Sequence, residues 1–292
     1  MSALAQAKWR GRLRVGLPSG PWRQPVVVVG TTIAALSLLL SAIGPWIVSD
    51  PLAQDAAPLL APSTAHWFGT DELGRDVFSR VIAGTRTSVP LTLVLVFGAM
   101  SIGALLGAVA GYFGKWWDEV IMRVVDLFFA FPLTILAMAI AASLGPSLRN
   151  AVIAGIVARW PAFARVVRGA MLQARTADYV SAARLLGASP RRILAVEIAR
   201  NVSGPLIVLG ALEVATGMLL LSGLSFLGLG AQPPTPEWGA MVSEGSKHLA
   251  EWWVAGFPGM AILGVAVAFN VVGDALRDML DPGTRAETEA GR

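Results

Sequence analysis

Long apolar stretches almost free of charge constrain this chain more than any other feature. A helix needs about 20 mostly apolar residues to cross a bilayer, and five stretches clearly meet that length: residues 26–48, 89–113, 127–148, 202–230 and 252–273. Of the 292 residues, 55% are hydrophobic and only 14% are charged, which is too little charge for a water-soluble surface. The sequence therefore predicts an all-α integral membrane protein.

A sixth and weaker span is predicted at residues 151–167, which contain Arg159 and Arg165. With six spans and a cytoplasmic N-terminus, 17 of the 23 Lys and Arg residues fall on the cytoplasmic side. Cytoplasmic loops of membrane proteins carry such an excess of positive charge. We therefore predict that both termini lie inside, and that the positive charge reflects topology and not nucleic-acid binding.

The predicted spans divide the chain into tails, an anchor, an outer loop and a core. The first span is longer than the apolar region of a signal peptide, so it is predicted to be an uncleaved anchor. The predicted boundaries are 1–25 for a basic cytoplasmic tail near anionic lipid, 26–48 for span one, 49–88 for the extracytoplasmic loop, 89–276 for a core with spans two to six, and 277–292 for a cytoplasmic C-terminal tail.

Each of the two long connecting segments contains a predicted helix start. In the outer loop, Thr70 precedes Asp71 and Glu72, and acidic residues in a first turn favour a helix; a short amphipathic helix is expected there. In the cytoplasmic segment 169–201, Thr176 can cap a helix over 177–187, and Ser189-Pro190 can start a second one. This helix–turn–helix suits docking by another protein, although a basic amphipathic stretch resting on lipid is the alternative.

Several kinds of chemistry are excluded by missing residue types. The chain has no cysteine, so it forms no disulfide, iron–sulfur cluster or cysteine-based zinc site. The two histidines, His66 and His248, fall in separate outer loops, which argues against a metal site. The phosphate-loop pattern G-x-x-x-x-G-K-S/T does not occur, so ATP cannot be bound by that route.

Charges predicted at membrane depth are functional candidates because they are costly to bury in lipid. Glu213 lies near the middle of the fifth span and could contact a cationic group of a transported molecule, or it could instead pair with Arg159. At the inner end of the third span, Asp126 follows Arg123 by three positions and is expected to pair with it.

Residues 179–193, YVSAARLLGASPRRI, and residues 198–201 resemble the EAA loop of binding-protein-dependent ABC importer permeases. The family's two alanines and glycine match Ala182, Ala183 and Gly187, while Ser181 stands where the family has Glu. The resemblance implies a coupling helix that docks on an ATPase subunit, with these candidate contacts: Tyr179, Ser181, Ala182, Ala183, Leu186, Gly187 and Ala188.

Three further motifs narrow the resemblance to the C-type permeases of dipeptide, oligopeptide and nickel importers. They are HWFGTDELGRDVFSR at 66–80, LSFLGLGAQPPTPEWG at 224–239 and NVVGDALRDMLDP at 270–282. The resemblance implies a type I ABC importer permease fold in the inner membrane, with no catalysis by this chain. It would form half of a pathway for short peptides; nickel complexes or another small peptide-like ligand are the alternative cargo.

The resemblance also implies partners. These are a second permease in a heterodimer, two ATPase subunits that bind ATP and Mg²⁺, an extracytoplasmic substrate-binding protein and membrane lipids, with no cofactor in this chain and no nucleic acid. The small residues Gly103, Gly107 and Gly111 suggest close helix packing, plausibly against the second permease. The candidate pore residues are Glu213, Ser222 and Ser225, and the candidate contacts for the binding protein are Trp67, Asp71, Arg75, Asp76, Gln232 and Trp238.

Two other classes of function are weighed against this prediction. A secondary transporter or channel working alone often has inverted repeats, which the sequence does not show. An intramembrane hydrolase would need a Ser-His or paired-Asp constellation at membrane depth, but both histidines fall in predicted loops.

Overall fold

The computed structural model describes residues 24–178, 180, 185, 187, 192 and 199–280. Within these residues the regular secondary structure is helical, apart from one isolated bridge between Thr70 and Asp76. Five helices are long and apolar enough to cross a membrane. They are α1 (Pro25–Ile47), α2 (Val77–Phe113), α5 (Leu148–Arg175), α8 (Ala199–Phe226) and α10 (Trp253–Leu280).

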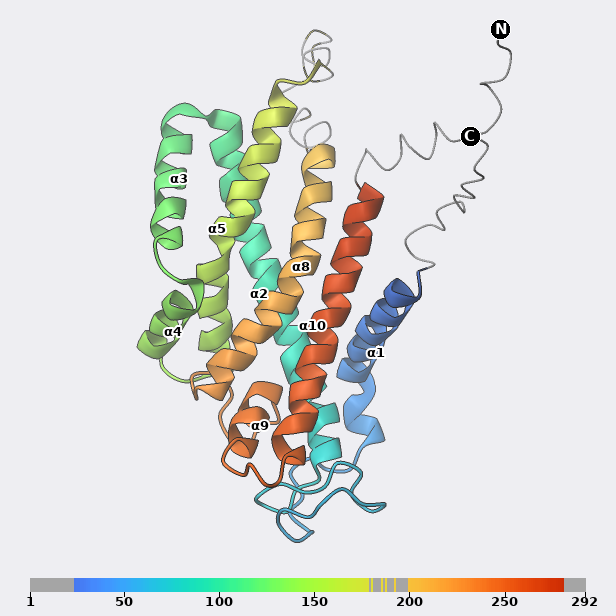
Figure 1. Ribbon diagram of the computed structural model, residues 1–292. Helices are drawn as coiled ribbons and strands as arrows, with labels where there is room; N and C mark the ends of the chain where they lie inside the picture. The colour runs from blue at the N-terminus through green and yellow to red at the C-terminus, as the bar shows by residue number, and fades with distance from the viewer. Residues whose placement is uncertain are drawn as a thin grey trace, which may run out of the picture.

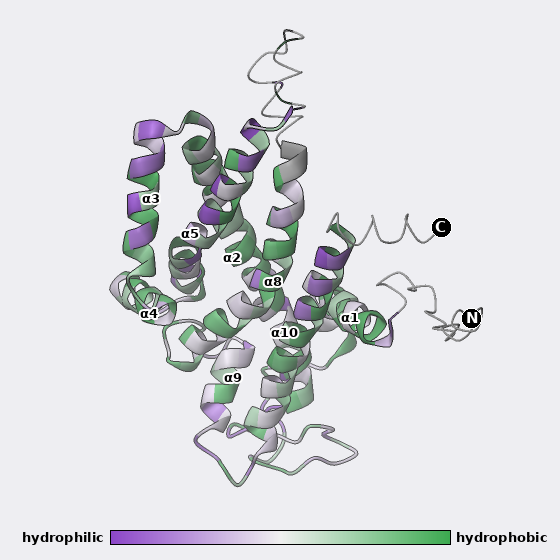
Figure 2. Ribbon diagram, turned by 45° about the horizontal axis from the view of Figure 1, so that its top comes forward, coloured by the Kyte–Doolittle hydropathy of each residue, from purple (hydrophilic) through white to green (hydrophobic). Residues whose placement is uncertain are grey.

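The long helices form one elongated bundle with two distinct ends. The end of α10 and the facing ends of α5 and α8 lie at one end, toward which the start of α1 points, whereas the 48–76 segment and the short helix α9 (Trp238–Gly245) lie at the other (Figure 1). Hydrophobic residues predominate along the helices (Figure 2). Hydrophilic residues gather on α3 and on the C-terminal turns of α5 and α10 (Figure 2). This pattern is that of a membrane-embedded bundle.

Helices α2 and α5 form the most extensive helix pair. Side chains added at Gly103 and Gly107 would collide with the backbone of α5 at Trp160 and Ala164. The predicted close packing is therefore confirmed, but these glycines contact α5 of the same chain and not a second subunit. Leu95, Phe163 and Leu221 lie in the adjoining buried core of α2, α5 and α8.

The predicted continuous third span is wrong, because the chain bends by 92° between α3 (Lys115–Phe129) and α4 (Leu133–Leu144). Proline at 132 disfavours a helical conformation in the residue before it and cannot donate a backbone hydrogen bond. The residues on both sides of the break are apolar, so the hydropathy of the sequence alone does not reveal the bend. If this bent pair counts as one span, the bundle has six.

The second long helix begins earlier than predicted, and no helix starts after Thr70. The Thr70 hydroxyl instead donates to Ala57 O and accepts from Leu60 N, each at 2.8 Å. The actual N-cap is Asp76, whose carboxylate accepts from Ser79 N at 2.8 Å. The predicted amphipathic helix of the outer loop is therefore replaced by an irregular segment followed by the first turns of α2.

The weak span predicted at 151–167 is confirmed as part of α5, which is the most buried of the five spanning helices. Its charged residues lower its hydropathy, but a helix surrounded by other helices does not need a lipid-compatible surface. The predicted helix–turn–helix lies mostly outside the described residues, since α5 ends at Arg175 and α8 begins at Ala199.

Candidate functional site

Arg159 and Glu213 form an ion pair at the middle of the bundle. Arg159 lies halfway along α5 and Glu213 halfway along α8, and an Nη1 atom of the arginine contacts Oε2 of the glutamate. Thr216 completes the cluster: its hydroxyl accepts from Arg159 Nη1 at 2.9 Å and lies 3.1 Å from Glu213 Oε2. Of the two predicted roles for Glu213, the pairing with Arg159 is the one observed.

The three residues of this cluster differ in their exposure. The Arg159 side chain is 7% exposed and that of Glu213 is 17% exposed, whereas Thr216 is exposed. Arg159 Nε is buried and has no hydrogen-bond partner. Because a buried, unpaired donor is costly, the guanidinium has unused binding capacity. The cluster can be approached only from the side of Thr216 and Glu213.

The two serines predicted to line the pore are buried near the C-terminal end of α8. Gly239 packs against the backbone of Ser222, and Gly230 packs against Ser225. Ser225 Oγ accepts from Ala231 N at 3.3 Å, and Ser222 Oγ has no partner. Both serines therefore hold the segment that leads into α9, and neither faces an open surface in this conformation.

A network of four charges, three of them on buried side chains, holds together the end of the bundle that contains the 48–76 segment and α9. Arg75 Nε lies 2.6 Å and Arg80 Nε 3.3 Å from Asp71 Oδ2, and an Nη2 atom of each arginine lies 3.2 Å from Glu244 Oε2. The two positive and two negative charges balance. They connect the turn before α2, the first turns of α2 and the end of α9.

The burial of this network changes how the predicted docking residues are interpreted. Asp71, Arg75 and Trp238 are each 2% exposed, so they cannot contact a docked protein in this conformation. Instead, Trp238 Nε1 donates to Val81 O at 2.9 Å and attaches α9 to α2. Trp67 is 66% exposed and Gln232 is exposed, so these two remain available at the surface.

Both histidines pair with carboxylates at this same end of the bundle. His66 Nδ1 lies 3.0 Å from Asp76 Oδ1, and His248 Nε2 lies 3.0 Å from Glu72 Oε2. The first pair shares its aspartate with the N-cap of α2. Asp76, a predicted docking residue, is therefore already engaged within the chain.

Glu237 is an important residue that sequence reasoning missed. It is completely buried, accepts from Gly239 N at 3.1 Å and Ala240 N at 2.9 Å, and accepts from the Ser88 hydroxyl at 3.1 Å. Burial raises the pKa of this carboxyl against the opposing effect of its hydrogen bonds. An acidic residue directly before a helix is an N-cap signal, so the start of α9 was detectable.

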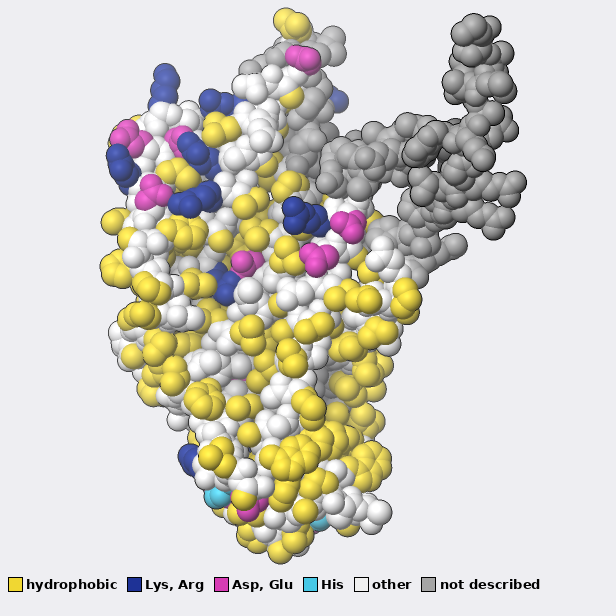
Figure 3. Space-filling model, viewed as in Figure 1, with side chains coloured by type: hydrophobic (Ala, Val, Ile, Leu, Met, Phe, Trp, Pro, Cys, Tyr) yellow, Lys and Arg dark blue, Asp and Glu magenta, His cyan; other side chains and the backbone are white. Residues whose placement is uncertain are grey.

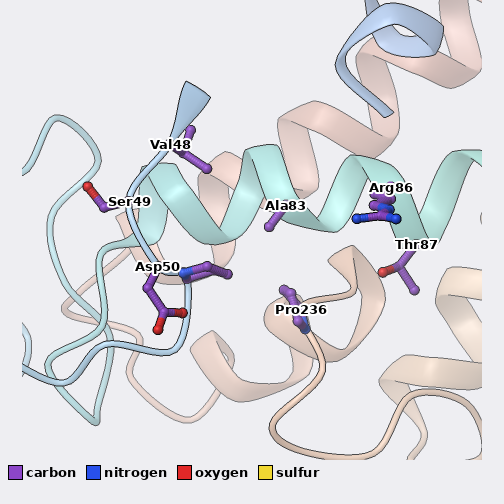
Figure 4. Close-up of a pocket in the computed structure, with 8 residues that line it drawn as sticks. Val48, Ser49, Asp50, Ala83, Arg86, Thr87 and Pro236 are labelled. Carbon is purple, nitrogen blue, oxygen red and sulfur yellow. The ribbon is translucent and has the colours of Figure 1, made fainter. Parts of the chain in front are cut away.

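A cavity of about 500 Å³ opens beside the end of α1 and the first turns of α2. Its lining comes from the segment after α1, from α2 and from the residue before Glu237, with Asp50 and Arg86 on different walls (Figure 4). None of the predicted pore residues lines it. The cavity and the intramembrane cluster are therefore separate features.

At the opposite end of the bundle, charged contacts attach α3 to α5. Arg168 Nη2 lies 2.6 Å from Asp118 Oδ2, and Arg165 Nη2 lies 2.9 Å from Asp126 Oδ1. Asp126 was predicted to pair with Arg123 of its own helix. That prediction is wrong, because the arginine of the neighbouring helix is the partner.

Few of the predicted coupling residues lie within the described part of the chain. Tyr179, Ser181, Ala182, Ala183, Leu186 and Ala188 fall outside it. Gly187 has φ +79°, a left-handed conformation that favours glycine. Nearby, Val180 is buried against Val167 and Val202, whereas Leu185 is 90% exposed.

Comparison with known proteins yields a matching family and several similar permeases. The family described as "Binding-protein-dependent transport system inner membrane component" matches residues 103–286. The probable D,D-dipeptide transport system permease protein DdpC of Escherichia coli is 45% identical over 280 residues, covering 95% of this chain and 93% of that protein. The dipeptide transport system permease protein DppC of Alkalihalophilus pseudofirmus is 40% identical over 274 residues, covering 90% of each.

A third relative and a solved structure extend the comparison. The glutathione transport system permease protein GsiD of Pectobacterium atrosepticum is 45% identical over 222 residues, covering 76% of this chain and 74% of that protein. A chain of the inward-facing MetNI methionine ABC transporter superposes with a TM-score of 0.57 at 17% identity, covering 69% of this chain and 96% of that chain. At this identity the superposition supports the fold alone.

Proposed function

Because the chain belongs to the family of binding-protein-dependent transport system inner membrane components, we propose that it carries short peptides across the membrane as one half of a heterodimeric pathway. It is a permease subunit of an ABC importer. The observation that supports the cargo is the similarity to two dipeptide permeases, each covering nine-tenths or more of the chain. Glutathione, itself a short peptide, is the second candidate because of the similarity to GsiD.

The proposed partner subunits supply the ATP binding, the second half of the pathway and the peptide delivery that this chain does not provide. A second permease completes the pathway, two ATPase subunits bind ATP and Mg²⁺, and a binding protein delivers peptide from outside. The exposed Trp67 and Gln232 are the remaining surface candidates for contact with the binding protein. The buried charge network beneath them would keep this outer surface in shape.

The proposed orientation places both termini and the α5–α8 connection in the cytoplasm. The start of α1, the end of α5, the start of α8 and the end of α10 all point toward the same end of the bundle (Figure 1). Dark blue Lys and Arg side chains are also more numerous toward that end of the visible face (Figure 3). The positive-inside rule then favours that end as cytoplasmic, with the 48–76 segment and α9 outside.

The segment 177–187 is proposed to transmit the motion of the ATPases. Its described residues fit such a role: Val180 attaches it to the bundle, Leu185 is exposed, and Gly187 has a backbone conformation suited to ending a helix.

The test is ATP hydrolysis and dialanine uptake by the complete complex in liposomes, with and without binding protein. We expect binding protein to stimulate both in the wild type. Ala183→Asp and Gly187→Asp should abolish the stimulation while the complex still assembles, because a buried charge at the docking surface opposes contact. Gln173→Asp is the matched control, since it adds the same charge at an exposed site near the end of α5.

Three outcomes would contradict the proposal in different ways. Unchanged stimulation in both Asp variants would remove the coupling role from this segment. If ATP hydrolysis is stimulated and glutathione is taken up but dialanine is not, the cargo is glutathione and not a dipeptide. Dialanine uptake by the chain alone, without ATPase subunits, would favour the secondary transporter or channel.

A further inference from the structure

The geometry of Arg159, Glu213 and Thr216 points to a binding site for zwitterions inside the pathway. We propose that a short peptide with free termini exchanges partners with this ion pair in transit, its carboxylate binding Arg159 and its ammonium group binding Glu213. The inference rests on the proposed function, because it assigns a contact point to the proposed peptide cargo.

The position of the pair in the bundle is the first argument. Both charges lie at the middle of membrane-spanning helices, where a charge without a counter-charge is costly. Separating Arg159 from Glu213 is therefore favourable only if each receives another partner at the same time. A zwitterion supplies both partners, whereas an anion or a cation supplies one and leaves the other charge unpaired.

The unused donor on Arg159 is the second argument. A guanidinium can donate five hydrogen bonds, but Arg159 Nε is buried without a partner. A peptide carboxylate could accept from two guanidinium nitrogens together, a geometry that is stronger than a single contact. Such a ligand would satisfy the Nε atom that the resting pair leaves unsatisfied.

Access to the pair is the third argument. Thr216 is exposed and hydrogen-bonds to both charged side chains. Two turns further along the same helix, a Cβ added at Gly223 would have no neighbour within 4 Å. Ionisable side chains such as those of Arg159 and Glu213 at this depth face a bundle interior or a water-filled cavity and not lipid. A ligand moving along this face of α8 would reach Thr216 first and then Glu213.

The experiment uses the complete complex in liposomes, with its cognate partner permease, ATPases and binding protein. The main variant is the double substitution Arg159→Met with Glu213→Gln, which removes both charges and so leaves no unpaired charge in the membrane. We expect dialanine uptake per ATP hydrolysed to fall by about tenfold or more. This ratio is the readout because poor assembly lowers uptake and hydrolysis together.

A milder variant and a matched control accompany the double variant. Thr216→Val removes an exposed hydroxyl with little change in shape and should lower the same ratio by a smaller factor. Thr32→Val in α1 is the control, because the Thr32 hydroxyl is bonded to Val28 O of its own helix at 2.7 Å. It should leave the ratio unchanged.

Dialanine amide has the ammonium group but no carboxylate. Its uptake distinguishes a role of Arg159 and Glu213 in binding the peptide from a role in holding the bundle together. The binding protein is the same in every sample, so its own preference cancels when variant and wild type are compared. We expect the double variant to reduce amide uptake per ATP by less than about twofold, since the amide offers Arg159 no carboxylate and therefore cannot exchange with the pair even in the wild type.

Each result bears on a different claim. An unchanged dialanine ratio in the double variant, or equal loss for dialanine and its amide, would overturn the exchange and leave the pair with a structural role. A wild-type complex that responds to binding protein but transports no dialanine would instead contradict the proposed peptide cargo.

Discussion

The carboxylate of Glu237 joins the start of α9 to α2. It accepts two backbone N–H groups at the start of α9 and the hydroxyl of Ser88 in α2. Ser88 Oγ in turn accepts from Trp238 N at 3.2 Å. A single buried side chain therefore positions α9 relative to the spanning helices.

This burial predicts a pH dependence of stability. Because burial raises the pKa of Glu237, the folded protein retains a proton that the unfolded chain releases at lower pH. When the folded state binds more protons, a rise in pH favours unfolding. The stabilising contribution is therefore complete below the ordinary pKa of a glutamate and is lost as pH rises through the raised pKa of the folded state.

The measurement is the thermal unfolding midpoint of detergent-solubilised protein from pH 4 to pH 9, compared with Glu237→Gln. We expect the wild-type midpoint to decline more steeply with pH than that of the variant, which cannot titrate at this position. Parallel curves for the two proteins would contradict the prediction.

Sequence reasoning identified charged residues at single positions better than it identified their partners. It placed Glu213 at membrane depth and named Arg159 as a possible partner, because charges inside apolar runs are conspicuous. It assigned Asp126 to Arg123, since only neighbours within a helix can be paired without a fold; the observed partner, Arg165, is on another helix. Asp71 and Arg75 were taken as surface residues because their burial depends on Arg80 and Glu244.

At the scale of elements, the contact between α2 and α5 depends on glycine. A Cβ at Gly107 would collide with backbone atoms of Ala164, and one at Gly111 would collide with the Met171 side chain. Close backbone approach through small residues is a common source of helix association in membranes.

Gly107→Leu should therefore destabilise the bundle by about 1–3 kcal/mol, the usual cost of forcing extra atoms into a packed contact. The backbone of α5 cannot move aside without separating the two helices. Gly169→Leu is the control, because a Cβ at Gly169 of α5 has no neighbour within 4 Å. Chemical denaturation in mixed micelles measures both, and equal losses in the two variants would refute the explanation.

The bounds of the elements were predictable where hydropathy and helix ends coincide. The first predicted span, 26–48, lies within one residue of α1 at each end, whereas the last, 252–273, matches the start of α10 but ends well before Leu280. Hydropathy did not indicate the 92° bend before α4 or the first turns of α2. Those turns contain Arg80, and its charge suggested a loop in the sequence. In the structure, the carboxylates of Asp71 and Glu244 neutralise that charge.

At the scale of the whole molecule, the proposed orientation is directly testable because the chain contains no cysteine. Single cysteines can be introduced at Leu185, which is 90% exposed, and at Leu249, which is 85% exposed. In intact cells, a membrane-impermeant maleimide should label Leu249→Cys and not Leu185→Cys. Inverted vesicles should give the opposite pattern, and labelling reversed in both preparations would invert the proposed topology.

The pairing of Arg159 with Glu213 also has an electrical consequence. A lone elementary charge moved across the membrane would change in energy by about 2.3 kcal/mol per 100 mV of membrane potential, but the contributions of two opposite charges that stay together cancel. A zwitterion that exchanges with them preserves this cancellation. Peptide uptake should therefore proceed at the same rate whether a potassium gradient with valinomycin sets the voltage at zero or at about −100 mV. A steep voltage dependence would mean that the two charges separate along the membrane normal during transport.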